Sequence, residues 1–255
     1  MNQPPDRQLQ IVQSFRRLLL PGPINRSSTV RRQWWSGFAL IISLWIAPLP
    51  GLAQIASPWF DTFESRLEIL ALMQSLNAEI LSGSSATVSL QKWCRDHQMA
   101  AEPKIVARVI SNVDKIPSPE QLQRLQVANV SDITYRRVEL RCGSHVLSEA
   151  DNWYVPSRLT AAINNQLKTS TTPFGTAVQS LKPYRRTFAV RLLWSPLPAG
   201  WEQQPRPAEQ DGRRALRLPK ELFEHRALLY TGEHQPFSEV HERYHAQLLD
   251  FSRSR

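Results

Sequence analysis

The chain has 255 residues, of which 42% are hydrophobic and 21% charged, so it can bury a sizeable core and its composition excludes an intrinsically disordered protein. The formal net charge is +9, but residues 1–32 hold six arginines against one aspartate and account for +5 of it. The rest of the chain is mildly basic and has no stripe of lysine and arginine, which argues against a nucleic-acid-binding face.

The first 56 residues have the order of a secretory leader. Basic residues end at Arg32, the apolar run WWSGFALIISLWIAPL follows, and the small-residue stretch GLAQIA precedes Ser57. This order predicts a signal peptide with cleavage after Ala53, and an uncleaved membrane anchor is the alternative. In both cases positive charge before the apolar run leaves the body, residues 57–255, outside the cytoplasm, as in a periplasmic protein.

The body opens with a predicted amphipathic helix. Apolar side chains recur at helical spacing within residues 61–83, Asp61 can cap the helix, and Gly83 follows its end. The sequence TVSL at residues 87–90 predicts a short strand, and the stretch LQKWCRDH that overlaps its end predicts a helical piece. Cys94 and Cys142 are interpreted as two separate small buried side chains, and a disulfide between them is the alternative.

Two hairpins dominate the remaining chain. The first joins ITYRRVELRC to HVLSEADNWYVP across Gly143, and the second turns between residues 232 and 235. The other predicted elements are a strand at 104–110, helices beginning near Ser118, Thr160 and Thr172, a strand at 184–194, and a proline-rich surface loop at 195–214. Helices that alternate irregularly with hairpin-linked strands predict an α+β fold: a single antiparallel β-sheet with helices packed on it and ligand space between them.

The pentapeptide HERYH, His241 to His245, matches the zinc-protease pattern H-E-x-x-H. That pattern needs a helix, in which the two histidines lie one turn apart, and it needs a third ligand. The surrounding PFSEVHERY alternates with strand periodicity, and of the few residues after His245 only Asp250 could serve as a ligand. We therefore predict a strand here and no metal site.

Strand alternation also selects two candidate functional side chains. Glu242 shares a face with Val240 and Tyr244, so an inward orientation would bury its carboxylate as an acid or as a partner for arginine. Arg136 shares a face with Val138, so it is the arginine that alternation predicts to be buried and available to clamp a carboxylate. For both residues a solvated surface position is the alternative.

These segments resemble the bacterial chorismate lyases, which share their fold with the effector-binding domains of GntR-type repressors. The resemblance runs from about Leu67 to Tyr244 and lies in order and spacing. YRRVELRC resembles the family's arginine-bearing strand, in which the clamp arginine stands five residues before a cysteine. TTPFG resembles its T-P-L-G turn, and the strand after Pro236 resembles the one with the essential glutamate. The position that matches the family's second arginine is Asn152.

The resemblance implies Arg137 and Glu242 as catalytic residues and Leu76 and Phe174 as ligand-binding residues, with Glu239 as the alternative glutamate. It implies elimination of pyruvate from chorismate to give 4-hydroxybenzoate, without a metal or an organic cofactor. An exported body would not meet this cytoplasmic intermediate, so the alternatives are a related aromatic or enol-ether carboxylate as substrate, or binding without catalysis. We expect a monomer that binds a small aromatic carboxylate and no nucleic acid. It would contact a membrane only through an uncleaved leader.

Overall fold

The computed structural model of the chain describes residues 59–206 and 214–252. The predicted leader, residues 1–56, lies outside these residues, and so do residues 207–213 of the predicted proline-rich loop. The described residues belong to one compact unit of the chain. None of the helices in this described part is both long enough and apolar enough to cross a membrane.

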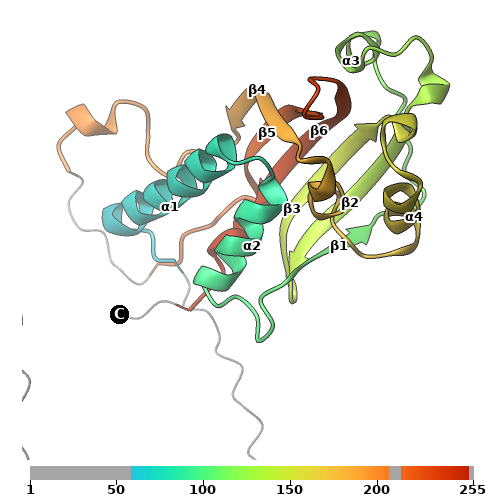
Figure 1. The fold of residues 1–255 in the computed structure, drawn as a ribbon. Coiled ribbons are helices and arrows are strands. Elements are labelled where there is room, and N and C mark those ends of the chain that lie inside the picture. The colour runs from blue at the N-terminus through green and yellow to red at the C-terminus, as the bar shows by residue number, and fades with distance from the viewer. Residues whose placement is uncertain (1–58, 207–213, 253–255) are drawn as a thin grey trace, which may run out of the picture. The chain divides into compact units, whose positions relative to one another are not determined.

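One antiparallel sheet of six strands forms the framework, in the spatial order β1-β2-β3-β6-β5-β4 (Figure 1). The strands are β1 (Ile105–Val109), β2 (Thr134–Cys142), β3 (His145–Tyr154), β4 (Tyr184–Leu192), β5 (Glu221–Tyr230) and β6 (Pro236–His245). The two predicted hairpins are β2–β3 and β5–β6, and β6 of the second hairpin pairs with β3 of the first. The predicted α+β class with a single antiparallel sheet is therefore confirmed.

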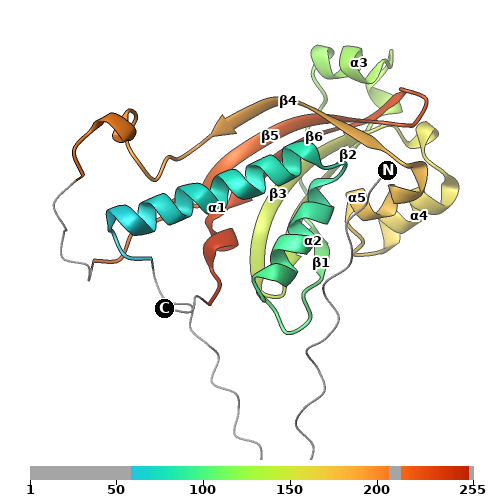
Figure 2. The same ribbon diagram turned by 60° about the vertical axis from the view of Figure 1, so that its left-hand side comes forward.

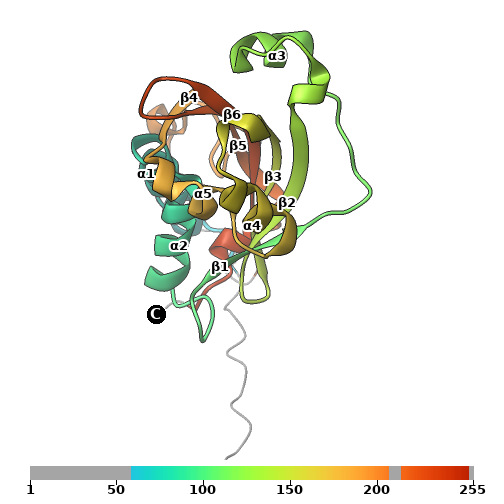
Figure 3. The same ribbon diagram turned by 45° about the vertical axis from the view of Figure 1, so that its right-hand side comes forward.

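The helices lie mainly on one face of this sheet. They are α1 (Phe63–Ser82), α2 (Ala86–Asp96), α3 (Pro119–Leu125), α4 (Ala161–Thr169) and α5 (Phe174–Ala177). Short 3-10 turns occur at Val130–Asp132, Pro156–Arg158, Gln179–Leu181, Trp201–Gln203 and Ala246–Leu249. Figures 2 and 3 show α1, α2, α4 and α5 over one face, here called the inner face, while α3 lies beyond one end of the sheet. The opposite, outer face of the sheet carries charged side chains such as Arg137 and Glu149. Helix α3 contacts this face at β6, where its Arg124 pairs with Glu239.

The N-cap of helix α1 lies one residue later than predicted. The side chain of Thr62, not Asp61, accepts a hydrogen bond from the Ser65 N–H and so satisfies one free donor of the first turn. Asp61 instead pairs with Arg66, one turn into the helix. Gly83 follows the last helical residue, as predicted.

The predicted strand at residues 87–90 is wrong, because this stretch forms the first turn and a half of α2. Thr87 and Leu90 are buried together with Trp93, one and two turns along a single helix face. Burial of that face outweighs the weak preference of β-branched residues for strands. Placing the helix here brings its N-terminal residues to the sheet, where they contribute to the site described below.

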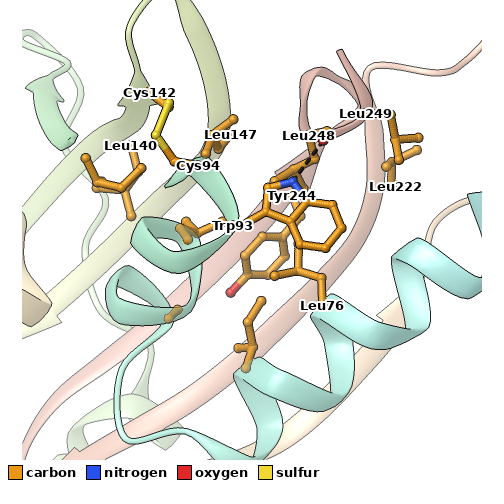
Figure 4. Packing of buried hydrophobic residues seen from close by; sticks show 14 of the residues in the cluster. Leu76, Trp93, Cys94, Leu140, Cys142, Leu147, Leu222, Tyr244, Leu248 and Leu249 are labelled. Atoms are coloured by element: carbon orange, nitrogen blue, oxygen red, sulfur yellow. Dashed lines mark hydrogen bonds between the residues drawn. A yellow bond between two sulfur atoms is a disulfide. The ribbon is translucent and has the colours of Figure 1, made fainter. Parts of the chain in front are cut away.

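A disulfide between Cys94 and Cys142 ties α2 to the end of β2, which corrects the expectation of two separate thiols (Figure 4). Both cysteines are fully buried in the main core cluster between the inner face and helices α1 and α2. In the same cluster the Trp93 indole N–H donates to the Leu248 carbonyl at 2.9 Å. Sequence spacing could not show this pairing, because 48 residues separate the two cysteines and only the packing of α2 on the sheet brings them together.

Candidate functional site

A pocket lies on the inner face, between the sheet and the N-terminal ends of α2 and α5. The empty space within it is about 470 Å³, with the open solvent at its mouth included. Its lining combines apolar and polar side chains: Ser85, Ala86, Thr87, Arg136, Val138, Leu140, Ala150, Asn152, Phe174, Gly175, Arg185, Leu229, Val240 and Glu242. Among the described residues, two arginines and one glutamate are the charged members of this lining.

Arg136 of β2 is a buried cation, and no carboxylate of the described residues pairs with it. The residue is only 7% exposed, and its Nε and Nη2 donors have no hydrogen-bond partner among the described residues. Burial lowers the pKa of this guanidinium, but arginine keeps its charge in proteins. A buried charge whose donors make no hydrogen bonds destabilises the fold unless an opposite charge or an acceptor pairs with it. This position is therefore suited to an anion from outside the chain.

Asn152 of β3 adds a further donor beside Arg136, its direct cross-strand neighbour. The Ser238 hydroxyl donates to Asn152 Oδ1 at 2.6 Å, which leaves the Nδ2 donor of the amide buried and without a partner in the described residues. Neighbouring side chains on one face of an antiparallel pair lie about 5 Å apart. Arg136 and Asn152 therefore form a wall of hydrogen-bond donors.

The opposite wall carries an ion pair that is complete within the chain. Arg185 of β4 donates from Nη2 to Glu242 Oε2 at 2.6 Å and from Nη1 to Oε1 at 3.3 Å. The Tyr244 hydroxyl donates to the same Oε2 at 2.9 Å. Burial alone would lower the pKa of Arg185, but the Glu242 carboxylate outweighs burial and raises it. Burial, with Glu242 beside the phenol, raises the pKa of Tyr244 well above its ordinary value.

His225 stands behind this pair, opposite Glu242 in the strand register and fully buried. Its Nε2 bonds Asn77 Oδ1 of α1 at 2.7 Å, while its Nδ1 has no partner among the described residues. Burial is the main reason that its pKa falls to about 4, so the ring is neutral at physiological pH. His225 therefore links α1 to β5, the neighbour of the strand that carries Glu242, without adding charge to the pocket.

The strand register fixes the spacing between the two polar walls. Arg136 and Glu242 lie two strands and one inward-facing row apart, because Arg136 pairs with Asn152 and Glu242 pairs with Ala150. Strand spacings of about 4.8 Å and a two-residue step of about 6.8 Å put their Cα atoms about 12 Å apart. Ala150 and Asn152 of β3 lie between them in the register, and both Arg136 and Glu242 line the pocket together with apolar Val138 and Val240.

Phe174 closes the pocket from the helical side. The ring is 8% exposed and packs against Tyr154 and Phe237, with centroid distances of 5.4 and 6.2 Å. The next residue must be small, because a Cβ added at Gly175 would lie 2.3 Å from the Ser85 hydroxyl oxygen and 2.8 Å from Thr87 Oγ1. The close approach of α5 to the first turn of α2 depends on this glycine.

Of the four residues that the resemblance selects, Glu242 and Phe174 line the pocket, and Arg137 and Leu76 do not. Arg137 points to the outer face, where its Nη2 donates to Glu149 at 2.7 Å, so the pocket contains Arg136, the arginine that alternation selects. Leu76 is 1% exposed and packs in the core cluster with Tyr244 (Figure 4). Glu239, the alternative glutamate, pairs with Arg124 on the outer face.

The residues of HERYH lie in β6, as alternation predicts, and are divided between the two faces. His241 bonds Glu224 on the outer face, while Glu242 faces the pocket. In an extended strand residues four apart are about 13 Å from one another, too far for His241 and His245 to share one ion. Across the described residues as a whole, no group of three or more histidine, cysteine or acidic side chains could hold a metal ion.

Sequence reasoning missed three polar side chains of the lining, those of Arg185, Ser85 and Thr87. Arg185 lies in a segment correctly predicted as a strand, YRRTFAVRLLW, and its alternation with Arg186 indicated that one of the two faces inward. Ser85 and Thr87 were missed because the segment around them was interpreted as a strand. A small polar residue before an amphipathic stretch is a helix-cap signal that could have identified the N-terminus of α2.

Comparison with known proteins identifies a relative of the chain. No family model matches the chain. Over 195 residues the chain is 45% identical to the uncharacterized protein y4mC of Sinorhizobium fredii (strain NBRC 101917 / NGR234), and the match covers 76% of this chain and 81% of that protein.

Solved structures to which the chain is distantly similar include those of bacterial regulators. The effector domain of PhnF from Mycobacterium smegmatis is 11% identical, with a TM-score of 0.39, over 64% of this chain and 89% of that chain. A GntR-family transcriptional regulator from Enterococcus faecalis V583 is 13% identical, with a TM-score of 0.35, over 58% of this chain and 99% of that chain. Likenesses this distant carry no conclusion about ligand or activity.

Proposed function

The chain belongs to the same family as y4mC of Sinorhizobium fredii, and we propose that it binds a small aromatic carboxylate in the pocket beneath α2 and α5. The observation that carries this proposal is Arg136, a buried arginine with free Nε and Nη2 donors among the described residues. Together these two groups can donate two parallel hydrogen bonds to the two oxygens of one carboxylate. Asn152 Nδ2 adds a third donor to the same wall.

The remainder of the lining suits a flat, apolar body. Val138, Leu229 and Val240 form one wall from the sheet, and the Phe174 ring faces them from α5. Glu242 at the far wall offers carboxylate oxygens to a hydroxyl or other donor of the ligand. A ligand with one carboxylate, a ring and a polar group opposite the carboxylate meets each of these requirements.

Binding can be tested by isothermal titration of the full-length chain with benzoate and 4-hydroxybenzoate. We expect binding that is lost, by at least about tenfold in Kd, in Arg136→Met, because a charge-assisted pair is worth about 1.5–3 kcal/mol. The matched control is Arg137→Met, which removes the neighbouring arginine from the outer face of the same strand and leaves the affinity unchanged. Equal loss in both variants, or no binding by the unaltered chain, would contradict the proposal.

A second candidate function is elimination of pyruvate from chorismate to give 4-hydroxybenzoate. It is supported by the presence of an arginine and a glutamate, Arg136 and Glu242, in one pocket shielded by Phe174. Orientation and electrostatic bias would carry such a reaction. The test is incubation of the full-length chain with chorismate, followed by detection of 4-hydroxybenzoate. Production that Glu242→Gln abolishes and Glu239→Gln preserves would establish the lyase, and absence of product leaves binding without catalysis.

We further propose that the body of the protein acts outside the cytoplasm. The order of basic, apolar and small residues before Ser57 supports export, and so does the Cys94–Cys142 disulfide, because disulfides persist in oxidising compartments. Alkaline phosphatase fused after the last residue should be active only when residues 1–56 are present. Mass spectrometry of the mature chain then distinguishes cleavage after Ala53 from an uncleaved anchor.

A further inference from the structure

We infer that Arg185 determines the charge of the ligand: through its pair with Glu242 it sets the pocket to accept one negative charge and to disfavour a second. The inference rests on the proposed binding of an aromatic carboxylate and specifies it further. It argues against the second candidate function, because chorismate carries two carboxylates. Arg185 comes from β4, an edge strand outside the segments in which either candidate arginine was predicted.

The position of Arg185 is unusual for an edge strand. Most of β4 is exposed, yet the Arg185 side chain is only 3% exposed and is directed across the inner face to Glu242. Its Nε donates to Thr187 Oγ1 at 3.2 Å, so every part of the guanidinium is engaged on the side of the sheet. Long arginine side chains at an edge normally reach solvent. Burial here places a second positive charge in the pocket lining.

The pair also fixes what Glu242 can offer to a ligand. Oε2 already accepts two hydrogen bonds, from Arg185 and Tyr244, while Oε1 accepts one long bond of 3.3 Å. The carboxylate therefore faces a ligand as an acceptor with capacity left on Oε1, and it suits a hydroxyl donor. A second ligand carboxylate at this wall would meet Glu242 as a like charge.

Charge balance leads to the same conclusion. Arg136 and Arg185 are positive and Glu242 is negative, and no other lining residue in the described part of the chain is charged, so these residues give the pocket a charge of +1. One ligand carboxylate brings the total to zero, whereas a dicarboxylate leaves an excess negative charge in a site where Arg136 and Glu242 are each less than one tenth exposed. Uncompensated buried charge is strongly disfavoured. We conclude that aromatic monocarboxylates are the ligand class and that dicarboxylates are selected against.

The test compares two probes, benzoate and benzene-1,3-dicarboxylate, by isothermal titration of the full-length chain at pH 7. The unaltered chain should bind benzoate at least about tenfold more tightly. Glu242→Gln keeps the shape of the side chain but raises the pocket charge to +2, so the preference should shift by at least about tenfold toward the dicarboxylate. The double change Arg185→Gln with Glu242→Gln returns the charge to +1 and should restore the preference for benzoate.

Glu239→Gln is the matched control, because Glu239 also pairs with an arginine but on the outer face of β6. It should leave the ratio of the two affinities unchanged. Equal affinity of the unaltered chain for both probes, or an unchanged ratio in Glu242→Gln, would overturn the inference while carboxylate binding itself still stands. Failure of both probes to bind any of the folded variants would overturn the proposed function, and the inference with it. The return of the ratio in the double variant separates charge from shape.

Discussion

Replacing Arg136 with methionine should make the ligand-free protein more stable while it abolishes binding. Arg136 is 7% exposed, and its Nε and Nη2 donors have no partner in the described part of the chain. Methionine is an apolar side chain of similar length. The change therefore removes a buried charge and two donors without hydrogen-bond partners, and it keeps most of the packing. Stability of the ligand-free fold is expected to increase because Arg136 is retained for ligand binding and destabilises the fold.

The size of the effect can be bounded from the same observations. An unsatisfied buried donor costs about 1–3 kcal/mol, and hydrophobic replacement of buried charges gains about 1–4 kcal/mol. Part of this gain is lost if the pocket is open to water, so we expect about 2 kcal/mol in the free energy of unfolding. For a domain of this size that corresponds to an increase of about 4–8 °C in Tm.

The assay is urea unfolding of the full-length chain without ligand, followed by tryptophan fluorescence. Arg136→Met should move the midpoint to higher urea. Arg137→Met should move it to lower urea, because it removes one of the cations that pair with Glu149 on the outer face and leaves Lys220 as its partner. A destabilised Arg136→Met variant with an unchanged m-value would refute the reasoning, since it would show that the guanidinium is already satisfied in the free protein.

Three further predictions concern the framework of the site. Reduction of the Cys94–Cys142 disulfide should cost about 4 kcal/mol, as expected for a link across 48 residues, and should lower the urea midpoint. His225 has a folded pKa of about 4 against 6.5, so the unfolded chain binds a proton first and stability should fall by up to about 3 kcal/mol as pH drops from 6.5 to 4. Urea titrations at several pH values should show this slope, and His225→Gln should flatten it. Gly175→Ala should weaken benzoate binding because its Cβ would meet Ser85, whereas Gly232→Ala, with open space around it, should not.

The sequence by itself determined most of the elements. Hydrophobic periodicity and turn residues located α1, α3, α4 and both hairpins, because these signals act over a few residues and do not depend on distant partners. The same strand parity placed Glu242 and Arg136 on the inner face, and β6 confirms that HERYH is extended. Spacing borrowed from the chorismate lyases selected Arg137 instead, and a one-residue difference in a strand is enough to move a side chain to the other face.

Only the tertiary structure decided how these elements complete one another. Residues 87–90 become helical because packing of one α2 face against the sheet outweighs local propensity. Cys94 meets Cys142 because that packing brings α2 to the end of β2. Arg185 reaches Glu242 although 57 residues separate them, since both lie on the inner face of the same sheet. Local patterns report which side chains face inward, but the partner of a buried charge is set by the folded chain as a whole.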